Sequence, residues 1–243
     1  MSETLDSFLG GRMKLVQPSD GYRAGIDPIF LAASLSPKPH EKILDIGAGV
    51  GVAAIALAVR CPHANVIGLE VQPDLVDFAL KNISANLVKD RVEMVNGDLM
   101  SPPHFLKPNS FDQIMTNPPY YEYNRTQSSP IPGKAQANTE TVDLGKWIKH
   151  CLKLLKPKGG FTMIHRAERL SEILFHLGNR VGDLVVYPLW PGSNKAARRV
   201  IIQGRKNIGG ELRLAQGLTL HGGMEKYTPE AEAVLRHAQA IIL

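Results

Sequence analysis

The sequence of 243 residues predicts an α/β fold in which helices cover both faces of a mainly parallel β-sheet. Short runs of apolar and β-branched residues alternate with longer segments of helical period, and this alternation predicts crossover connections between parallel strands. The composition, 44% hydrophobic and 21% charged, is near the globular average. A chain of this length can bury one core, so we expect a single domain over residues 1–243.

The first half of the chain shows the alternation most clearly. A buried strand that ends at glycine is followed by an apolar helix, a second strand and a second helix, and two further strands come before residue 117. The predicted bounds are Lys42–Gly47, Val52–Arg60, Asn65–Glu70, Pro73–Leu87, Arg91–Val95 and Phe111–Thr116. Pro73 fits the first turn of its helix, where the missing N–H costs little.

The second half predicts an amphipathic helix, a strand, another helix and two final strands. Their bounds are Asp143–Leu155, Phe161–His165, Ala167–Leu177, Asp183–Leu189 and Arg199–Gln203. Pro157 and the turn Lys158-Gly159-Gly160 are expected to end the first of these helices. The last two strands have no helix between them, so we expect them to pair antiparallel at an edge of the sheet.

Two segments fall outside this pattern. Residues 1–40 are expected to form an N-terminal cap segment that ends in a short apolar helix. Residues 120–141, rich in Ser, Pro, Asn and Gln, form a long aperiodic loop directly after a predicted strand. Loops of this length within a compact domain are usually either functional or disordered, and its place directly after a strand makes this loop a candidate for substrate binding.

The overall composition excludes several classes of protein. No apolar run approaches the ~20 residues that span a membrane. The acidic N-terminus lacks the features of a signal peptide. Cys61 and Cys151 lie too far apart in the sequence to form a metal-ligand cluster by themselves. These features predict a cytoplasmic protein with neither a membrane nor a metal partner, and they leave the oligomeric state open.

The charge is distributed unevenly along the chain. Residues 1–119 carry 10 basic and 13 acidic side chains, whereas residues 120–243 carry 18 basic and 10 acidic ones. The excess of positive charge therefore lies wholly in the second half. This asymmetry favours a polyanionic partner that binds there.

A glycine-rich loop joins the first strand to the first helix, in the sequence Asp45-Ile46-Gly47-Ala48-Gly49-Val50-Gly51. Three glycines at alternate positions let the backbone pass close under a ligand, which then faces amide N–H groups and a helix N-terminus. The spacing differs from the dinucleotide fingerprint G-x-G-x-x-G. Glu70 ends the second strand, where a carboxylate can accept from both ribose hydroxyls, and Asp98 follows the third strand, where it can accept from an adenine amine. These acids could instead only cap the helices that follow, but three in order beside a glycine loop favour a ligand site.

The chain passes from a strand through the motif Asp-x-Gly-x-Gly-x-Gly into a helix, and then into a second strand that ends at Glu70. This order resembles the class I S-adenosylmethionine-dependent methyltransferases. The resemblance implies a Rossmann-like sheet of seven strands in the order 3-2-1-4-5-7-6 with an antiparallel edge strand. It also implies S-adenosyl-L-methionine as the cofactor, with the glycine loop on its methionine part, Glu70 on the ribose and Asp98 on the adenine amine. The cofactor-binding residues that it implies here are Asp45, Gly47, Ala48, Gly49, Gly51, Glu70, Val71, Asp98, Leu99 and Asn117.

The fourth strand runs into Asn117-Pro118-Pro119-Tyr120, which we predict to be the catalytic segment. An exocyclic amine conjugated to a ring or carbonyl is a poor nucleophile because its lone pair is delocalised. The Asn117 carboxamide oxygen and the Pro118 carbonyl oxygen can accept both of its N–H bonds and favour a pyramidal nitrogen, while Tyr120 stacks on the planar group. The motif resembles that of methyltransferases acting on adenine N6, guanine N2 or a glutamine amide.

The residues before the first strand point to one class of substrate. The pattern Q-P-x-x-G-Y-R-x-x-x-D-x-x-x-L-A, beginning at Gln17, resembles the bacterial tRNA1(Val) adenine-N6 methyltransferase family. That resemblance implies methylation of a tRNA adenine near the anticodon and places Tyr22, Arg23 and Asp27 over the cofactor pocket. Five further residues offer a ring and cations to RNA: Tyr121, Arg125, Lys195, Arg198 and Arg199.

Three alternatives remain open from the sequence. A glutamine-N5 methyltransferase acting on a release factor usually carries a longer N-terminal domain than the ~40 residues present here. A guanine-N2 rRNA methyltransferase often carries a duplicated domain, which this length does not hold. A cofactor-binding scaffold without catalysis commonly loses the glycine loop or the N-P-P-Y segment, and both are intact.

Overall fold

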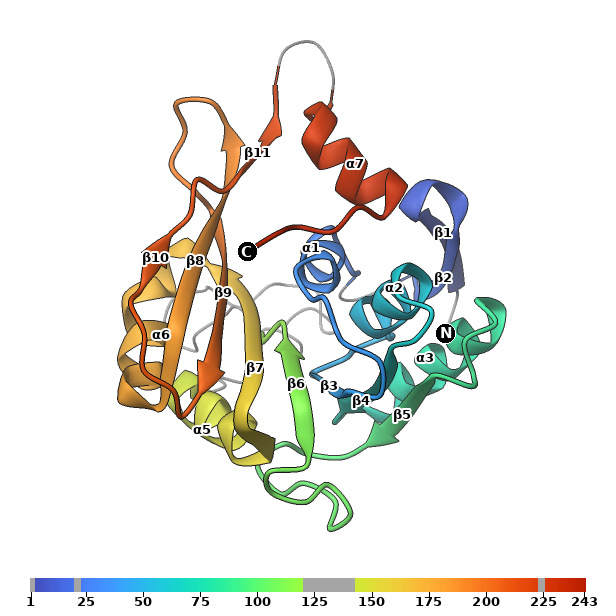
Figure 1. The fold of residues 1–243 in the computed structure, drawn as a ribbon. Coiled ribbons are helices and arrows are strands. Elements are labelled where there is room, and N and C mark those ends of the chain that lie inside the picture. The colour runs from blue at the N-terminus through green and yellow to red at the C-terminus, as the bar shows by residue number, and fades with distance from the viewer. Residues whose placement is uncertain (1–2, 20–22, 120–142, 223–225) are drawn as a thin grey trace, which may run out of the picture.

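A central β-sheet forms the body of the molecule, and helices pack on both of its faces (Figure 1). The computed structural model describes residues 3–19, 23–119, 143–222 and 226–243. Within them the sheet has nine strands: β3 (Lys42–Ile46), β4 (Asn65–Glu70), β5 (Val92–Asn96), β6 (Phe111–Thr116), β7 (Leu155–Arg166), β8 (Val181–Gly192), β9 (Arg199–Lys206), β10 (Arg213–Leu214) and β11 (Leu218–His221). The predicted α/β class is confirmed.

The strand order is β10-β8-β9-β7-β6-β3-β4-β5, and β11 also pairs with β8. Strands β3 to β9 reproduce the predicted order 3-2-1-4-5-7-6, but the predicted total of seven strands was too low. The antiparallel strand β9 lies between β7 and β8 rather than at the edge. Both additional strands pair with β8 and run parallel to it. They cover backbone groups that this long strand would otherwise leave unpaired.

The helices are divided between two apolar cores, one on each face of the sheet. One core includes residues of α1 (Asp27–Ala33), α2 (Val52–Arg60), α3 (Pro73–Ala85) and α7 (Pro229–His237). The other includes residues of α5 (Leu144–Leu154) and α6 (Leu170–Leu177). Helix α2 is buried from Val52 to Ala58, which explains why its sequence is apolar on nearly all sides. No helix among the described residues is long and apolar enough to cross a bilayer.

Strand β7 begins earlier than the sequence predicted. Leu155 was expected to end the preceding helix, but it is fully buried and pairs with Phe111 of β6. The chain therefore continues as a strand through Pro157, with an irregularity in the register and a positive φ of 64° at Lys158. Burial of the Leu155 side chain outweighs the turn signal of the proline and the glycines.

The N-terminal segment forms a β-hairpin that the sequence reading did not predict, made of β1 (Glu3–Phe8) and β2 (Met13–Pro18). It lies beside α3, and the predicted short helix follows as α1 (Figure 1). The two ends of the chain meet here, because Arg12 donates to the carbonyl of His237 at 2.8 Å and the Ile241 N–H donates to the carbonyl of Ala33 at 2.8 Å.

Candidate active site

The glycine loop leaves the carboxyl end of β3 and turns into α2. Gly47, Gly49 and Gly51 have φ values of 73°, 55° and 86°, a region that residues with a Cβ rarely adopt. A Cβ on Gly47 would lie 3.3 Å from the ring of Trp147, and one on Gly51 would lie 3.3 Å from the Cβ of Ala79. A Cβ on Gly49 would meet nothing within 4 Å. The outer glycines therefore allow close packing, and Gly49 presents an open face of the loop.

Glu70 lies against this loop from the end of β4. Its Oε2 accepts from the Gly49 N–H at 2.9 Å and its Oε1 from the Gln72 N–H at 2.9 Å, and only 6% of the residue is exposed. The carbonyl of Leu69 accepts from the N–H groups of Gly47 and Ala48 at 2.9 and 3.1 Å. The carboxylate predicted to bind a ribose is thus held in place by a hydrogen bond from the glycine loop.

Asp45 lies beneath the loop and is 2% exposed. Burial raises the pKa of its carboxyl to about 7; the backbone N–H of Ala54 opposes the shift and the charge of Glu70 adds to it. Its Oδ2 makes no hydrogen bond to a described residue. A buried carboxyl oxygen without a partner favours a nearby donor or cation, which suits a positively charged cofactor.

The third predicted acid lies next to the first two. Asp98 follows β5, where its Oδ1 accepts from the Met100 N–H at 2.9 Å, and the Gly97 N–H donates to the carbonyl of Glu70 at 2.9 Å. Leu99 is buried, while Val71 is exposed beyond the end of β4. The ends of β3, β4 and β5 thus present Asp45, Glu70 and Asp98 along one edge of the sheet, where ligands bind in open α/β folds.

Asn117 enters this edge from the neighbouring strand β6. Thr116 pairs with Ile46 in register, so Asn117 begins its segment beside the start of the glycine loop. The Thr116 hydroxyl donates to the Ile46 carbonyl at 2.8 Å and accepts from Trp147 Nε1 at 3.0 Å. Pro118 is buried and Pro119 is exposed. One buried threonine and one tryptophan therefore fix the spacing between the predicted catalytic segment and the predicted cofactor loop.

The N-terminal cap is tied down by its polar side chains. Asp6 Oδ2 accepts from Gln17 Nε2 at 2.7 Å and from the Arg23 guanidinium at 2.5 Å, and Gln17 Oε1 accepts from the Ala24 N–H at 2.8 Å. Asp27, predicted to bind the cofactor, forms an ion pair with Arg199, predicted to bind RNA, at 2.8 Å. Arg23 therefore holds the cap segment together internally, and the Asp27–Arg199 ion pair joins the cap to β9.

The remaining predicted residues fall into two groups. Lys195 and Arg198 are exposed between β8 and β9, at the carboxyl end of β8. Because β9 is antiparallel to both β7 and β8, this end lies at the same edge of the sheet as Asn117. Tyr22, Tyr120, Tyr121 and Arg125 lie outside the described residues, as does the predicted substrate loop 120–141.

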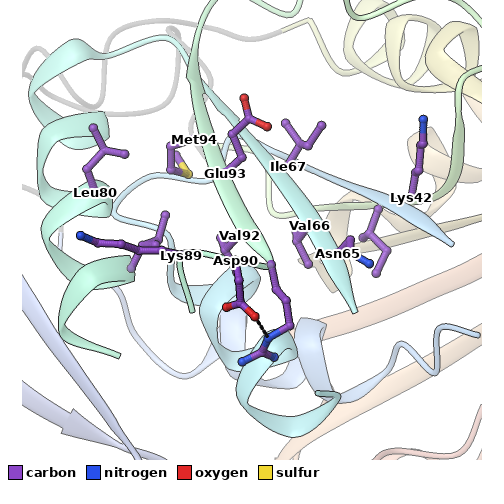
Figure 2. A pocket seen from close by; sticks show the side chains of 13 residues that line it. Lys42, Asn65, Val66, Ile67, Leu80, Lys89, Asp90, Val92, Glu93 and Met94 are labelled. Carbon is purple, nitrogen blue, oxygen red and sulfur yellow. Dashed lines mark ion pairs between the residues drawn. The ribbon is translucent and has the colours of Figure 1, made fainter. Parts of the chain in front are cut away.

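A hollow of about 710 Å³ lies elsewhere, around the amino ends of β4 and β5 (Figure 2). Its lining combines sheet residues such as Val66 and Met94 with surface charges such as Lys89 and Asp90, which forms an ion pair with Arg91 at 3.4 Å. It lies at the edge of the sheet opposite to the glycine loop and is separate from the site. Among residues 3–19, 23–119, 143–222 and 226–243, no group of three or more His, Cys, Asp or Glu side chains could hold a metal ion.

A match to a known protein family covers more than half of the chain. The model of the family described as methyltransferase small domain matches residues 25–172, which include the glycine loop, the three acids and Asn117. The chain belongs to this family. The predictions of a methyltransferase and of S-adenosylmethionine as its cofactor are confirmed.

Several curated relatives of this methyltransferase share one name. A tRNA1(Val) (adenine(37)-N6)-methyltransferase of Porphyromonas gingivalis is 31% identical over 69% of this chain and 68% of its own length. A protein of the same name from Bacteroides thetaiotaomicron is 33% identical over 58% of this chain and 59% of its own length. The crystal structure of a protein described as a predicted O-methyltransferase, from Agrobacterium tumefaciens, matches with a TM-score of 0.75 at 22% identity, over 89% of this chain and 99% of that one. The structural match shows the fold alone.

The site residues fit the cofactor of this methyltransferase. Gly49 leaves an open face on the loop, the Asp45 carboxyl oxygen lacks a described partner, and Glu70 is fixed between them. These groups suit a ligand with a cationic end and a ribose.

The structural roles of Thr116, Trp147 and Asn82 were missed by the sequence reading. Two features of the sequence could have pointed to these roles. Trp147 is one of only two tryptophans in the chain, and Asn82 is a polar residue at an apolar position of its helix.

Proposed function

We propose that this methyltransferase acts on the exocyclic N6 amine of an adenine in the anticodon region of a tRNA. The observation that carries the proposal is the register of β6 against β3, in which Thr116 pairs with Ile46, so that Asn117 directly follows β6 next to the start of the glycine loop. The names of the curated relatives support the same substrate. The cofactor supplies an electrophilic methyl group on a positively charged sulfur.

Residues of the chain then prepare the nucleophile. The Asn117 carboxamide oxygen and the Pro118 carbonyl oxygen accept the two N–H bonds of the amine, which favours a pyramidal nitrogen with its lone pair directed at the methyl group. The proton on nitrogen becomes acidic once the N–C bond forms, so no strong general base is required. Thr116 and Trp147 hold this segment at a fixed distance from the cofactor loop. Catalysis thus depends on positioning rather than on a base with a matched pKa.

The surface beyond Asn117 supports an RNA substrate. Along the same edge, the exposed side chains of Lys195 and Arg198 lie in the connection from β8 to β9. Arg166 at the end of β7 and Arg199 at the start of β9 are paired with Glu168 and Asp27, so the proposed phosphate contacts rest on Lys195 and Arg198. Positive charges on one side of an active site attract the phosphates of a nucleic acid and position it without reading its sequence. Residues 120–141 supply Tyr121 and Arg125 as candidates to contact the base and its neighbours.

The test is transfer of a tritiated methyl group to bulk tRNA, to rRNA and to a peptide-chain release factor. Label in tRNA, mapped to N6-methyladenosine by mass spectrometry of digested nucleosides, is the expected result. Asn117→Ala should lower the rate at least ~100-fold, because it removes an acceptor at the reacting amine. Asn65→Ala, on an exposed asparagine at the opposite edge, should leave the rate unchanged. Label in rRNA or in the release factor would overturn the tRNA substrate, and full activity of Asn117→Ala would overturn the site.

A further inference from the structure

Asn82 is a polar side chain in the middle of an apolar helix face. It lies on α3 between the buried residues Ala79 and Ile83 and is 0% exposed. A buried amide without hydrogen bonds is costly, so its partners explain its presence. Its Oδ1 accepts from the Val16 N–H at 2.7 Å, and its Nδ2 donates to the carbonyls of Val16 and Val50, each at 3.0 Å.

These partners belong to two separate elements, the N-terminal hairpin and the glycine loop. Val16 lies on β2, directly before the Gln17 that holds the cap residue Ala24. Val50 lies inside the glycine loop, between Gly49 and Gly51. We propose that Asn82 is a positioning residue for the cofactor, because its amide joins the glycine loop to the N-terminal cap. The inference rests on the cofactor part of the proposed function and is independent of the RNA substrate.

The same helix provides a matched control one turn further on. Asn86 Oδ1 accepts from the Lys14 N–H at 2.9 Å, and its Nδ2 donates to the Lys14 carbonyl at 2.6 Å and to the Asn82 carbonyl at 2.8 Å. Four residues of helix advance about 6 Å and two residues of strand about 6.6 Å, so the two amides meet alternate residues of β2. Both asparagines therefore dock the hairpin, but only the Asn82 side chain also bonds to the glycine loop.

The first measurement compares the Kd of S-adenosylhomocysteine for Asn82→Ala and Asn86→Ala by calorimetry. We expect Asn82→Ala to weaken binding about tenfold, because the Val50 carbonyl loses its donor and the loop is less ordered. Asn86→Ala should stay within about twofold of the wild type, because this side chain holds the hairpin without a bond to the glycine loop. Equal losses of affinity in the two variants would overturn the proposal, because hairpin docking alone would then account for both.

A second variant separates hydrogen bonding from packing. In Asn82→Asp at pH 9, an ionised carboxylate can still accept from the Val16 N–H but cannot donate to Val50. Lowering the pH to 5 protonates this buried acid and restores a donor, so its Kd should approach that of the wild type measured at the same pH. A ratio of the two Kd values that stays constant with pH would contradict a role through this hydrogen bond.

Hydrogen exchange of the wild-type protein tests the coupling without any substitution that could impair folding. Binding of S-adenosylhomocysteine should slow exchange of the Val16 N–H several-fold, because ordering of the loop also orders the amide that accepts from it. The Lys14 N–H, bound to Asn86, should change less. No slowing at Val16 on binding would overturn the inference, whatever the behaviour of the variants.

Discussion

At the scale of single residues, two buried titratable groups make opposite contributions to stability. Burial, together with the charges of Arg169 and Arg199, lowers the pKa of His165 to about 4, so its imidazole is neutral in the folded protein at neutral pH. Its stabilising contribution is lost as the pH falls from 6.5 through 4. Asp45 behaves in the opposite way, because its pKa is raised to about 7 from an ordinary 3.8. Its contribution is present below about pH 4 and is lost as the pH rises through 7.

This difference leads to a prediction for Asp45→Asn in the ligand-free protein. His165 is present in both the variant and the wild type, so the difference between their melting temperatures reports on Asp45. The amide keeps the shape of the carboxyl and cannot ionise, so the melting temperature of the variant should rise relative to that of the wild type as the pH is raised from about 4 to 7, and the difference should level off above pH 7. Binding of S-adenosylmethionine should weaken in the same variant because the cofactor loses an opposing charge. A melting-temperature difference that stays constant between about pH 4 and 7 would show that the pKa of Asp45 is not raised in the folded protein.

At the scale of secondary-structure elements, the sequence predicted α2, β4 and β6 with the bounds that the structure shows. Each has a strong local signal, either apolar residues on all sides or a β-branched run between turns. The hairpin was missed although Met13 and Leu15 alternate with polar neighbours after the Gly10-Gly11 pair. Its stability depends on partners about 70 residues away on α3, which no local pattern shows.

The ion pair between Asp27 and Arg199 joins two elements whose relation the sequence did not reveal. Asp27 is the first residue of α1 and Arg199 the first of β9, and their side chains are 18% and 29% exposed. We predict that Arg199→Met lowers the free energy of unfolding by about 1 kcal/mol, because a partly buried carboxylate loses a cation. Arg198→Met, on its exposed neighbour, should change it by less than ~0.5 kcal/mol.

Urea denaturation of Asp27→Asn, Arg199→Met and the double variant gives the coupling energy of this pair directly. The double variant should be less destabilised than the sum of the single variants, since each change removes the same interaction. A coupling energy near zero would mean that the two side chains act independently, and it would leave Arg199 available for the phosphate contact that the sequence suggested.

At the scale of the whole molecule, the strand order separates the acidic and the basic half of the chain onto two sides of the sheet. The acidic first half forms β3 to β6, and the basic second half forms β7 to β11 on the other side of β6. Asn117 lies at the boundary, directly after β6. The sequence alone gave the charges of the two halves and the residues of the cofactor loop. It could not show that Arg23 and Arg199 are engaged in ion pairs with Asp6 and Asp27, because the first pair depends on the hairpin, which the sequence did not predict, and the second joins elements that are distant in the chain.

The last prediction concerns the salt dependence of tRNA binding. Each phosphate neutralised by a cation contributes about 0.9 to the slope of log K against log salt concentration for a duplex, and about 0.7 for a single strand. Lys195→Gln combined with Arg198→Gln should therefore reduce the slope by about 1.4 to 1.8 and leave the Kd of S-adenosylmethionine unchanged. Lys89→Gln combined with Lys158→Gln removes the same charge from exposed positions at the amino edge of the sheet and should leave the slope nearly unchanged. Filter binding over 50 to ~200 mM salt measures both. Equal reductions in the two double variants would show that the net charge of the protein, rather than a surface beside Asn117, attracts the RNA.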